Sequence, residues 1–439
     1  MKGVSKYSLI ILMLLISIIP PQINAGTRIA WYHTWGSWGD DYAVAACKDN
    51  YGNIYVVGFT AWLGPGNFYN IFVAKFSSKG VLIWDRAFGT PYGREYAKDV
   101  TIDSDGNLYI IGYEETPYAT YPFIVKVSKD GNLLWGYEVD SSAFIFNSIT
   151  ADQNGNIYVI GNYFDAYSST QDILIVKFDR DGTLISAWKY GSRSANEYGI
   201  DICIGKEGNI YIAGVTDENQ NFDVLIAKLD DQGSLIWCKR WGGLEDDYVR
   251  CISLDISRKY QYIYIAGYTE SVSLSKDVFI AKFDCDGNLL WSKVWYGPSD
   301  EDVSSNGLVA FKRGIYITGS TDSYGAGQTD TFLIMFSKRG RLIKALTFGW
   351  TSADEGNTII IGKRYIVCVG AKVYFNYEIK RFKATIITPQ FAVSSEYPSN
   401  GGVSVPIRSI SMLSEDPDAY IDYPLASDAY VFMCRGRFP

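Results

Sequence analysis

The chain has 439 residues, a formal net charge of −8 at pH 7, one histidine and seven cysteines. The negative charge opposes binding to polyanions, so nucleic acid is not an expected partner. The single histidine, His33, excludes a zinc site with several histidine ligands and leaves one residue for any Ser-His-Asp or Cys-His arrangement. The cysteines are scattered without metal-like spacing, and their odd number leaves at least one unpaired if the rest form disulfides.

Residues 1–25 have the pattern of a secretory signal peptide. Two lysines precede an apolar run from Leu9 to Ile19, and the small Ala25 marks the expected cleavage position. The run is short for a membrane-spanning helix, which needs about 20 apolar residues. We therefore expect a protein that is secreted or held at the cell surface, without a transmembrane helix after cleavage.

A short apolar motif recurs seven times along the chain. Four copies read GNIYVVG, GNLYIIG, GNIYVIG and GNIYIAG, and the last copy, RYIVCVG, is the most altered. The closing glycines stand at positions 58, 112, 161, 214, 267, 319 and 370, so the period lies between 49 and 54 residues. A period of this size is typical of solenoids and propellers.

Each repeat predicts four antiparallel strands. In the copy that begins at Glu95, strands are expected at 97–102, 108–111 and 123–127, and a fourth begins at Leu133. The Asp-x-Asp-Gly runs at 103–106, 179–182 and 284–287 lack the glycine at position six of a calcium loop, so we interpret them as turns. No convincing amphipathic helix of ten or more residues is found. The repeat therefore predicts an all-β fold in which each sheet packs against the next copy.

The ends of the repeat region complement each other. The seventh copy has its first two strands and an expected third strand at 377–384, but it lacks a fourth. Residues 28–36 align with the fourth strand of copy six, residues 341–349, and so supply the missing strand from the N-terminus. This arrangement predicts a seven-bladed β-propeller of four-stranded antiparallel blades over residues 26–386, closed by the N-terminal strand. An open solenoid has the same period but does not explain the complementary truncation.

Residues 387–439 do not carry the repeat. This segment is rich in proline but also contains many large apolar side chains, too many for a solvated linker. We expect it to be a C-terminal extension that packs on the propeller in short extended pieces.

The repeat resembles the SBBP β-propeller repeat family of secreted and surface proteins in bacteria and archaea. The resemblance rests on the GNIYV-G core, on hairpins such as AKFDCDGNLLW, and on the Trp or Phe before a closing Gly. It covers residues 28–384 and implies a propeller fold. It implies no catalytic residues or ligand, because family members generally have none assigned.

A carboxylate recurs where the first strand of most copies is expected to begin, with Phe144 at that place in copy three. We expect these acids to form a broken ring at the mouth of a central channel and to bind a divalent cation, a cationic ligand or a polyhydroxylated ligand. The alternative is structural, with each carboxylate accepting hydrogen bonds from nearby backbone N–H groups. The candidate acids are Asp41, Glu95, Glu197, Asp247, Asp302 and Glu355.

Aromatic residues also occur in the loops after the second strands, where the repeat does not require them. Exposed tyrosine and tryptophan side chains are typical of carbohydrate and protein contact surfaces, although packing within the loops is the alternative. The candidate ligand-binding aromatics are Trp62, Tyr69, Tyr118 and Tyr167.

These patterns favour a non-catalytic scaffold that binds a surface polymer, a glycan or a partner protein. The alternative is a polysaccharide-active enzyme, a glycosidase or lyase, that uses carboxylates and tyrosines on the loop face. No metal site or cofactor is expected beyond calcium at the acidic ring.

Overall fold

The computed structural model describes residues 27–373 apart from short gaps, together with five segments nearer the C-terminus. The gaps are 37–38, 62, 66–67, 219, 257–260, 274, 312–313, 326–327, 349–352 and 363–364, and the later segments are 395–396, 401–402, 407–409, 413–415 and 428–436. The predicted signal peptide lies outside the described residues. No helix in the described part of the chain could span a membrane.

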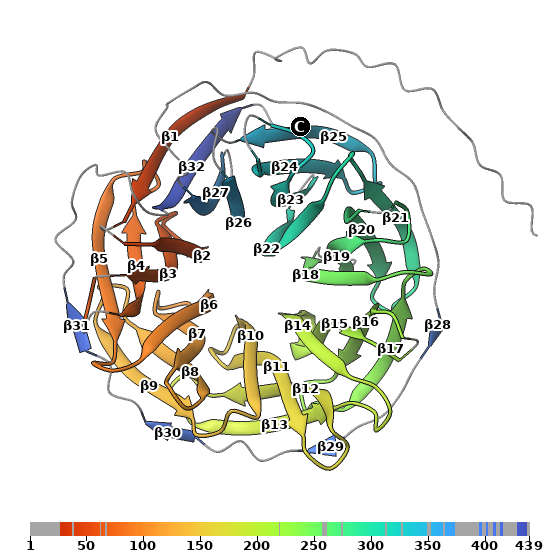
Figure 1. The fold of residues 1–439 in the computed structure, drawn as a ribbon, viewed down its shortest axis with the longest axis horizontal. Coiled ribbons are helices and arrows are strands. Elements are labelled where there is room, and N and C mark those ends of the chain that lie inside the picture. Colours follow the sequence, from red (N-terminus) through yellow and green to blue (C-terminus); the bar gives the residue numbers. More distant parts are fainter. Residues whose placement is uncertain are drawn as a thin grey trace, which may run out of the picture.

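The fold is the predicted all-β propeller, and the described residues include only one short 3-10 helix, Lys206–Gly208. Copies one to six of the repeat each form four antiparallel strands in chain order, with the first strand nearest the centre of the ring (Figure 1). The strands of copies one to three are β2 (Asp41–Lys48), β3 (Ile54–Ala61), β4 (Tyr69–Phe76), β5 (Leu82–Gly89), β6 (Arg94–Ile102), β7 (Leu108–Glu115), β8 (Thr120–Val127), β9 (Leu133–Val139), β10 (Phe144–Ala151), β11 (Ile157–Asp165), β12 (Thr170–Phe178) and β13 (Leu184–Tyr190). Those of copies four to six are β14 (Glu197–Ile204), β15 (Ile210–Thr216), β16 (Asp223–Leu229), β17 (Leu235–Trp241), β18 (Asp247–Ile256), β19 (Gln261–Thr269), β20 (Asp277–Asp284), β21 (Leu289–Trp295), β22 (Glu301–Phe311), β23 (Gly314–Thr321), β24 (Asp330–Ser337) and β25 (Leu342–Phe348).

The seventh copy is assembled from both ends of the chain. Its strands run outward in the order β26 (Ala353–Ile361), β27 (Tyr365–Val373), β32 (Asp428–Gly436) and β1 (Thr27–Trp35). The N-terminal strand is therefore the outermost strand, as predicted. Residues 377–384, expected to form the third strand, lie outside the described residues, and the third place in the sheet is taken by β32, which pairs with β27 on one side and with β1 on the other. The predicted propeller boundary at 386 is wrong for the same reason, since β32 belongs to the ring.

The predicted count of seven blades is wrong, because the described strands form six hydrogen-bonded sheets and so six blades. A parallel bridge between Asn306 of β22 and Thr358 of β26 joins copies six and seven into one eight-stranded sheet. The repeat pattern indicates which strands pair within one copy. It does not predict this bridge, because the two residues lie in the innermost strands of different copies.

Four short strands of the C-terminal segment lie along the outer rim of the ring (Figure 1). We call them the belt strands: β28 (Ser395–Glu396), β29 (Gly401–Gly402), β30 (Ile407–Ser409) and β31 (Leu413–Glu415). They add antiparallel to the outer strands of copies four, three, two and one, which are β17, β13, β9 and β5. These parts of the extension lie on the propeller in short extended pieces.

The hydrophobic core lies between neighbouring copies. Among the described residues, seven clusters of buried side chains each combine residues of two adjacent copies. One of them joins Val367 and Val431 of copy seven to Val56 and Phe72 of copy one. The motif strands are apolar on both faces because each of their sheets is covered on both sides. At the tight turns, glycines such as Gly106 adopt φ near 88°, which other residues rarely tolerate.

Removing β32 tests the closure of the ring. Truncation before Asp428 should leave β1 without a partner strand and expose the edge of β27, so we expect the melting temperature to fall by about 10 °C or more. Truncation after Gly436 keeps β32 and serves as the control. Equal melting temperatures for the two truncations would contradict the closure by both ends of the chain.

Candidate functional site

The first strand of each copy begins at one edge of the ring, which we call the entry face. The acids predicted there are Asp41, Glu95, Glu197 and Asp247, and all four side chains are buried, with exposed fractions of 0%, 0%, 6% and 2%. Phe144, the exception in copy three, is also buried, at 5%. The recurring position is therefore an interior position and does not form a solvent-facing ring.

The buried acids bind the connection that arrives from the preceding copy. The backbone N–H of Thr90 donates to Glu95 Oε1 at 3.0 Å, and that of Ser192 donates to Glu197 Oε2 at 2.9 Å. The backbone N–H of Gly243 donates to Asp247 Oδ2 in the same way. These contacts agree with the structural alternative, in which each carboxylate fixes the chain between two copies.

In copies six and seven, the buried acid is the residue directly before the predicted one. The buried acids there are Glu301 and Asp354, with exposed fractions of 0% and 1%, whereas Asp302 is half-buried and Glu355 is exposed. Asp302 accepts two hydrogen bonds from the Arg250 guanidinium of copy five, at 3.1 and 2.6 Å. Asp302 and Glu355 therefore each follow a buried acid and do not occupy the buried position themselves.

Burial raises the pKa of four of these acids. The pKa of Glu95 is raised to about 7, and hydrogen bonds from Thr90 oppose the rise. The pKa of Glu301 is also raised to about 7, mainly by burial and further by the carboxylate of Asp277 in the preceding copy. Burial likewise raises the pKa of Glu197 and of Asp247. Glu95 and Glu301 are therefore poor fixed anions at neutral pH.

The residue after each buried acid is a tyrosine in four copies, and these tyrosines belong to two aromatic clusters. The first cluster lies on copies one and two, where Phe59 contacts Tyr42, Tyr69 and Tyr96 with ring centroids 5.1, 5.7 and 5.0 Å apart. Tyr113 stacks on Tyr96 at 5.0 Å. All five side chains are half-buried. Among the predicted aromatics that the structure describes, Tyr69 is thus the one that lies in a cluster.

The second aromatic cluster lies on copies four and five. Phe222 contacts Tyr198 and Tyr248, and Tyr248 stacks on Tyr268 with the ring planes 4° apart. The Arg250 guanidinium lies 5.1 Å from the centroid of the Tyr248 ring. Since Arg250 also pairs with Asp302, this cluster combines aromatic faces with charged hydrogen-bonding groups.

Two of the other predicted aromatics, Tyr118 and Tyr167, do not join these clusters. Tyr118 and Tyr167 are fully exposed, at 95% and 103%, on the loops of copies two and three. Trp62 lies outside the described residues. The sequence reasoning missed Tyr42, Tyr96, Tyr198 and Tyr248, although an available signal was their common place directly after the recurring acid.

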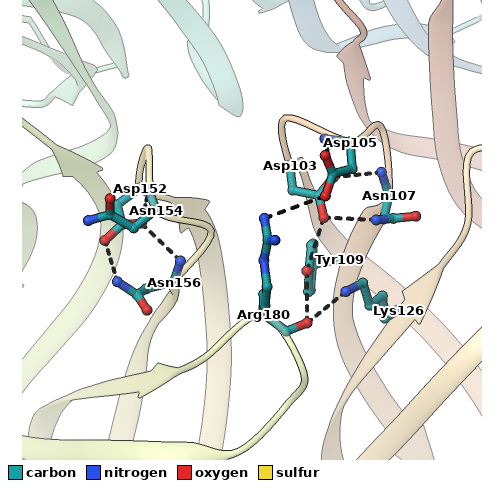
Figure 2. Close-up of polar contacts among 9 residues, drawn as sticks. All are labelled: Asp103, Asp105, Asn107, Tyr109, Lys126, Asp152, Asn154, Asn156 and Arg180. Carbon is teal, nitrogen blue, oxygen red and sulfur yellow. Dashed lines mark hydrogen bonds and ion pairs between the residues drawn. The ribbon is translucent and has the colours of Figure 1, made fainter.

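The opposite edge of the ring, which we call the hairpin face, carries the turns within each copy. Figure 2 shows one junction there, between copies two and three. Lys126 Nζ donates to the backbone oxygen of Arg180 at 2.6 Å and lies 4.9 Å from the centroid of the buried Tyr109 ring. The Arg180 guanidinium reaches back to Asp105 at 3.5 Å. Lys75 and Lys282 make the same contact with the turn of the next copy, at 2.9 and 3.2 Å.

The Asp-Gly turns of the hairpin face are closed by their own side chains. Asp103 Oδ1 accepts the backbone N–H of Asp105 and of Asn107, and Asp103 Oδ2 accepts the Asn107 amide at 3.0 Å (Figure 2). The same pattern holds Asp152 and Asn156 in the next copy. The predicted interpretation of these runs as turns is confirmed, because the carboxylate is occupied by the turn itself.

The described residues contain no group of three or more His, Cys, Asp or Glu side chains placed to hold a metal ion. Among the described cysteines, five form no disulfide: Cys47, Cys203, Cys238, Cys251 and Cys285. Burial raises the pKa of Cys203, Cys238 and Cys251, which disfavours their thiolates. His33 lies in β1, opposite Val431 of β32.

No family model matches the chain, and no curated protein matches it. Three solved structures illustrate what the fold is similar to. A protein of unknown function from Dyadobacter fermentans is 11% identical over 73% of this chain and 98% of its own, with a TM-score of 0.42. The polysaccharide lyase Uly1 is 10% identical over 90% of both chains, with a TM-score of 0.48. An exo-beta-1,3-galactanase from Clostridium thermocellum is 12% identical over 78% of this chain and 83% of its own, with a TM-score of 0.36. At this level of similarity they assign neither a ligand nor an activity.

The raised pKa of Glu95 predicts a pH-dependent stability. The folded protein holds the Glu95 proton more tightly than an unfolded chain, where the pKa of glutamate is about 4.3, so the free energy of unfolding should fall as pH rises from about 4 to about 7. Glu95→Gln keeps the shape without the charge. We expect this variant to match the parent at pH 5 and to exceed its stability at pH 8 by about 1–3 kcal/mol.

Denaturant unfolding at the two pH values measures this difference. Glu115→Gln is the control, because Glu115 lies in the same copy with its side chain 48% exposed and forms a surface ion pair with Arg94. If Glu95→Gln loses stability at pH 8, then the ionised carboxylate is needed at this position and the assignment is wrong.

Lys126→Met tests the contact on the hairpin face. The variant keeps an apolar stem but loses the hydrogen bond to Arg180 and the interaction with the Tyr109 ring. We expect a loss of about 1–3 kcal/mol in the free energy of unfolding. Lys129→Met, at an exposed turn position of the same copy, should change it by less than about 0.5 kcal/mol. Equal effects of the two substitutions would show that the contact contributes nothing specific.

Proposed function

We propose that this protein is a non-catalytic binding scaffold, secreted or held at the cell surface, whose entry face binds a glycan or glycan-like surface polymer. A partner protein is the other ligand class that such a face accommodates. The signal-peptide pattern of residues 1–25 supports secretion. The repeat further supports a place in the SBBP-type propeller family, on the motifs quoted above.

The observation that carries the proposal is the pair of aromatic clusters on the entry face. They present half-buried tyrosine rings that are already fixed by stacking on their neighbours, so little side-chain freedom remains to be lost on binding. Tyrosine offers an apolar ring face together with a hydroxyl group, which suits a sugar ring with its hydroxyls. Arg250, Asp302 and Lys98 add charged hydrogen-bonding groups beside the same rings.

The row of buried acids does not support a catalytic role for those residues. Glu95 and Glu301 have no exposed surface, so a substrate cannot reach them without opening the junction between two copies. The predicted ligand-binding role of Asp41, Glu95, Glu197 and Asp247 is therefore better replaced by the tyrosines that follow them. Tyr118 and Tyr167 remain outer contacts for an extended ligand.

A polysaccharide-active enzyme is the second candidate, and Glu355 is the observation in its favour. Glu355 retains solvent contact, yet partial desolvation raises its pKa and the carboxylate of Asp322 raises it further. A carboxyl group with a raised pKa is what a general acid in glycoside cleavage requires.

Incubation of the purified protein with a panel of polysaccharides separates the two functions. We expect retention of at least one polymer without release of fragments. The Tyr96→Ala, Tyr248→Ala double variant should weaken that retention about tenfold or more, since each ring contributes about 1 kcal/mol or more. Tyr51→Ala removes a ring that is 89% exposed on the hairpin face and is the matched control.

Two results would contradict the proposal. Release of oligosaccharides that Glu355→Gln abolishes would identify an enzyme with Glu355 as its acid. Retention that the double variant does not change would place the binding surface away from the aromatic clusters.

A further inference from the structure

Three polar side chains of the innermost strands meet between copies two, three and four. Asp99 of β6, Ser148 of β10 and Asp201 of β14 each directly follow a register shift in the pairing of the first strand with the second. A bulge of this kind re-aims the side chain beside it, and the three residues occupy the same place in successive copies. All three are buried, with exposed fractions of 6%, 5% and 8%.

The fold does not require a carboxyl group at this place. Copies one, five and seven have the same register shift, and the residues that follow it are Ala45, Cys251 and Thr358. These three side chains are buried as well. The carboxyl groups of copies two and four therefore carry a desolvation cost that these other copies avoid.

The hydroxyl group of Ser148 joins the two carboxyl groups. Ser148 Oγ lies 2.9 Å from Asp99 Oδ2 and 2.7 Å from Asp201 Oδ1. A hydroxyl group has one hydrogen, so it donates to one of these two oxygens. At the other contact the hydroxyl oxygen must accept, and a carboxyl oxygen donates only when it is protonated. Both contacts therefore exist together when one of the two acids carries a proton.

The neighbouring hydrogen-bond donors favour Asp201 as the acid that carries it. Asp99 accepts two backbone N–H groups, at 2.7 and 2.9 Å, and a further hydrogen bond from the Asn306 side chain of copy six. In the described part of the chain, Asp201 accepts two backbone N–H groups, at 2.8 and 2.7 Å. The additional donor stabilises the ionised form of Asp99.

The other titratable groups beside this pair are buried thiols. Cys47 of β2, Cys203 of β14 and Cys251 of β18 each interact electrostatically with one or both carboxyl groups. Burial raises the pKa of all three thiols, which keeps them neutral. Burial also raises the pKa of Asp99 and of Asp201, and the charge of Asp99 raises that of Asp201 further.

Two cations lie on strands that carry or border the pair, and both contact other groups. Lys98 precedes Asp99 on β6, and its ammonium group lies 5.9 Å from the centroid of the Tyr113 ring. Arg250 of β18 forms an ion pair with Asp302 at 2.6 Å. Among the described residues, no lysine or arginine forms an ion pair with either carboxyl group of the pair. Two negative charges there would have no cation to stabilise them.

We propose that Asp99, Ser148 and Asp201 share one proton and form a pH-sensitive contact across copies two to four. The protonated Asp201 Oδ1 donates to Ser148 Oγ, and the Ser148 hydroxyl donates to the ionised Asp99 Oδ2. When the proton leaves, two anions compete for one hydroxyl hydrogen and repel each other. One of the two contacts is then lost, so alkaline pH loosens the innermost strands at these junctions.

The pH dependence of unfolding tests the shared proton. Because the folded pair holds the proton more tightly than an unfolded chain, its loss destabilises the fold as pH rises. The equilibrium constant of unfolding should rise about tenfold per pH unit between the pKa of unfolded aspartate, about 4, and the pKa of folded Asp201, about 7. In Asp99→Asn and in Asp201→Asn, one carboxylate has the hydroxyl hydrogen to itself, so each variant should lose this rise relative to the parent. The double variant should lose no more than either single variant. Glu95 is present in all four proteins, so its own contribution cancels.

Two results would overturn the proposal. Two independent buried acids would each contribute a tenfold rise per pH unit, so the losses in the single variants would add in the double variant. An unchanged rise in Asp201→Asn would show that the pair holds no excess proton. Asp181→Asn, at an exposed turn position of copy three, is the control and should keep the rise of the parent.

Carbon-13 NMR of the parent protein gives a measurement that does not require the variants to fold. With the aspartate carboxyl carbons labelled, the two signals of the pair should shift with a common midpoint near pH 7, because both report the loss of the same proton. Separate midpoints for the two signals would assign a proton to each acid and contradict the sharing.

Discussion

Packing between neighbouring copies is the constraint on which the whole structure depends. A four-stranded sheet with two apolar faces has no stable form alone, so each copy must be covered by the next. The buried clusters between copies meet this need, and at several junctions polar contacts on the two faces of the ring hold neighbouring sheets in place. On the hairpin face a third-strand lysine such as Lys126 binds the turn of the next copy. On the entry face a buried acid such as Glu95 binds the connecting chain.

This division separates positions that the fold needs from positions that are free to vary. The buried acid begins the first strand in six of seven copies, and the exception, Phe144, is equally buried. The next residue is half-buried or exposed in every copy, and there the chain has tyrosine in copies one, two, four and five, Ile145 in copy three, Asp302 in copy six and Glu355 in copy seven. The side chain at this position differs in chemistry from copy to copy, whereas the backbone there is the same. Such a position is suited to form a binding surface.

Much of the fold could be predicted from the sequence, because the repeat encodes strands, turns and closure locally. The same locality explains the errors. In Glu301-Asp302 and Asp354-Glu355 two acids stand together, and the pattern of carboxylates cannot say which one is buried. The third strand of copy seven was sought at 377–384, close along the chain, but β32 comes more than fifty residues after β27. A long-range pairing of this kind leaves no repeat signal. The aromatic clusters were missed because their rings come from different copies and only the closed ring brings them together.

The two ends of the chain meet in one copy, and this has a consequence for how the ring is held. β32 lies between β27 and β1, so the last sheet is complete only when the C-terminal segment has returned to it. The belt strands lie on the path of that return, and each adds backbone hydrogen bonds to a copy already packed against its neighbours. The conformational entropy lost on closing so long a loop is thus offset in small steps around the rim. Stability at the junction of copies seven and one is therefore coupled to the outer strands of copies one to four, on the far side of the ring as well as beside it.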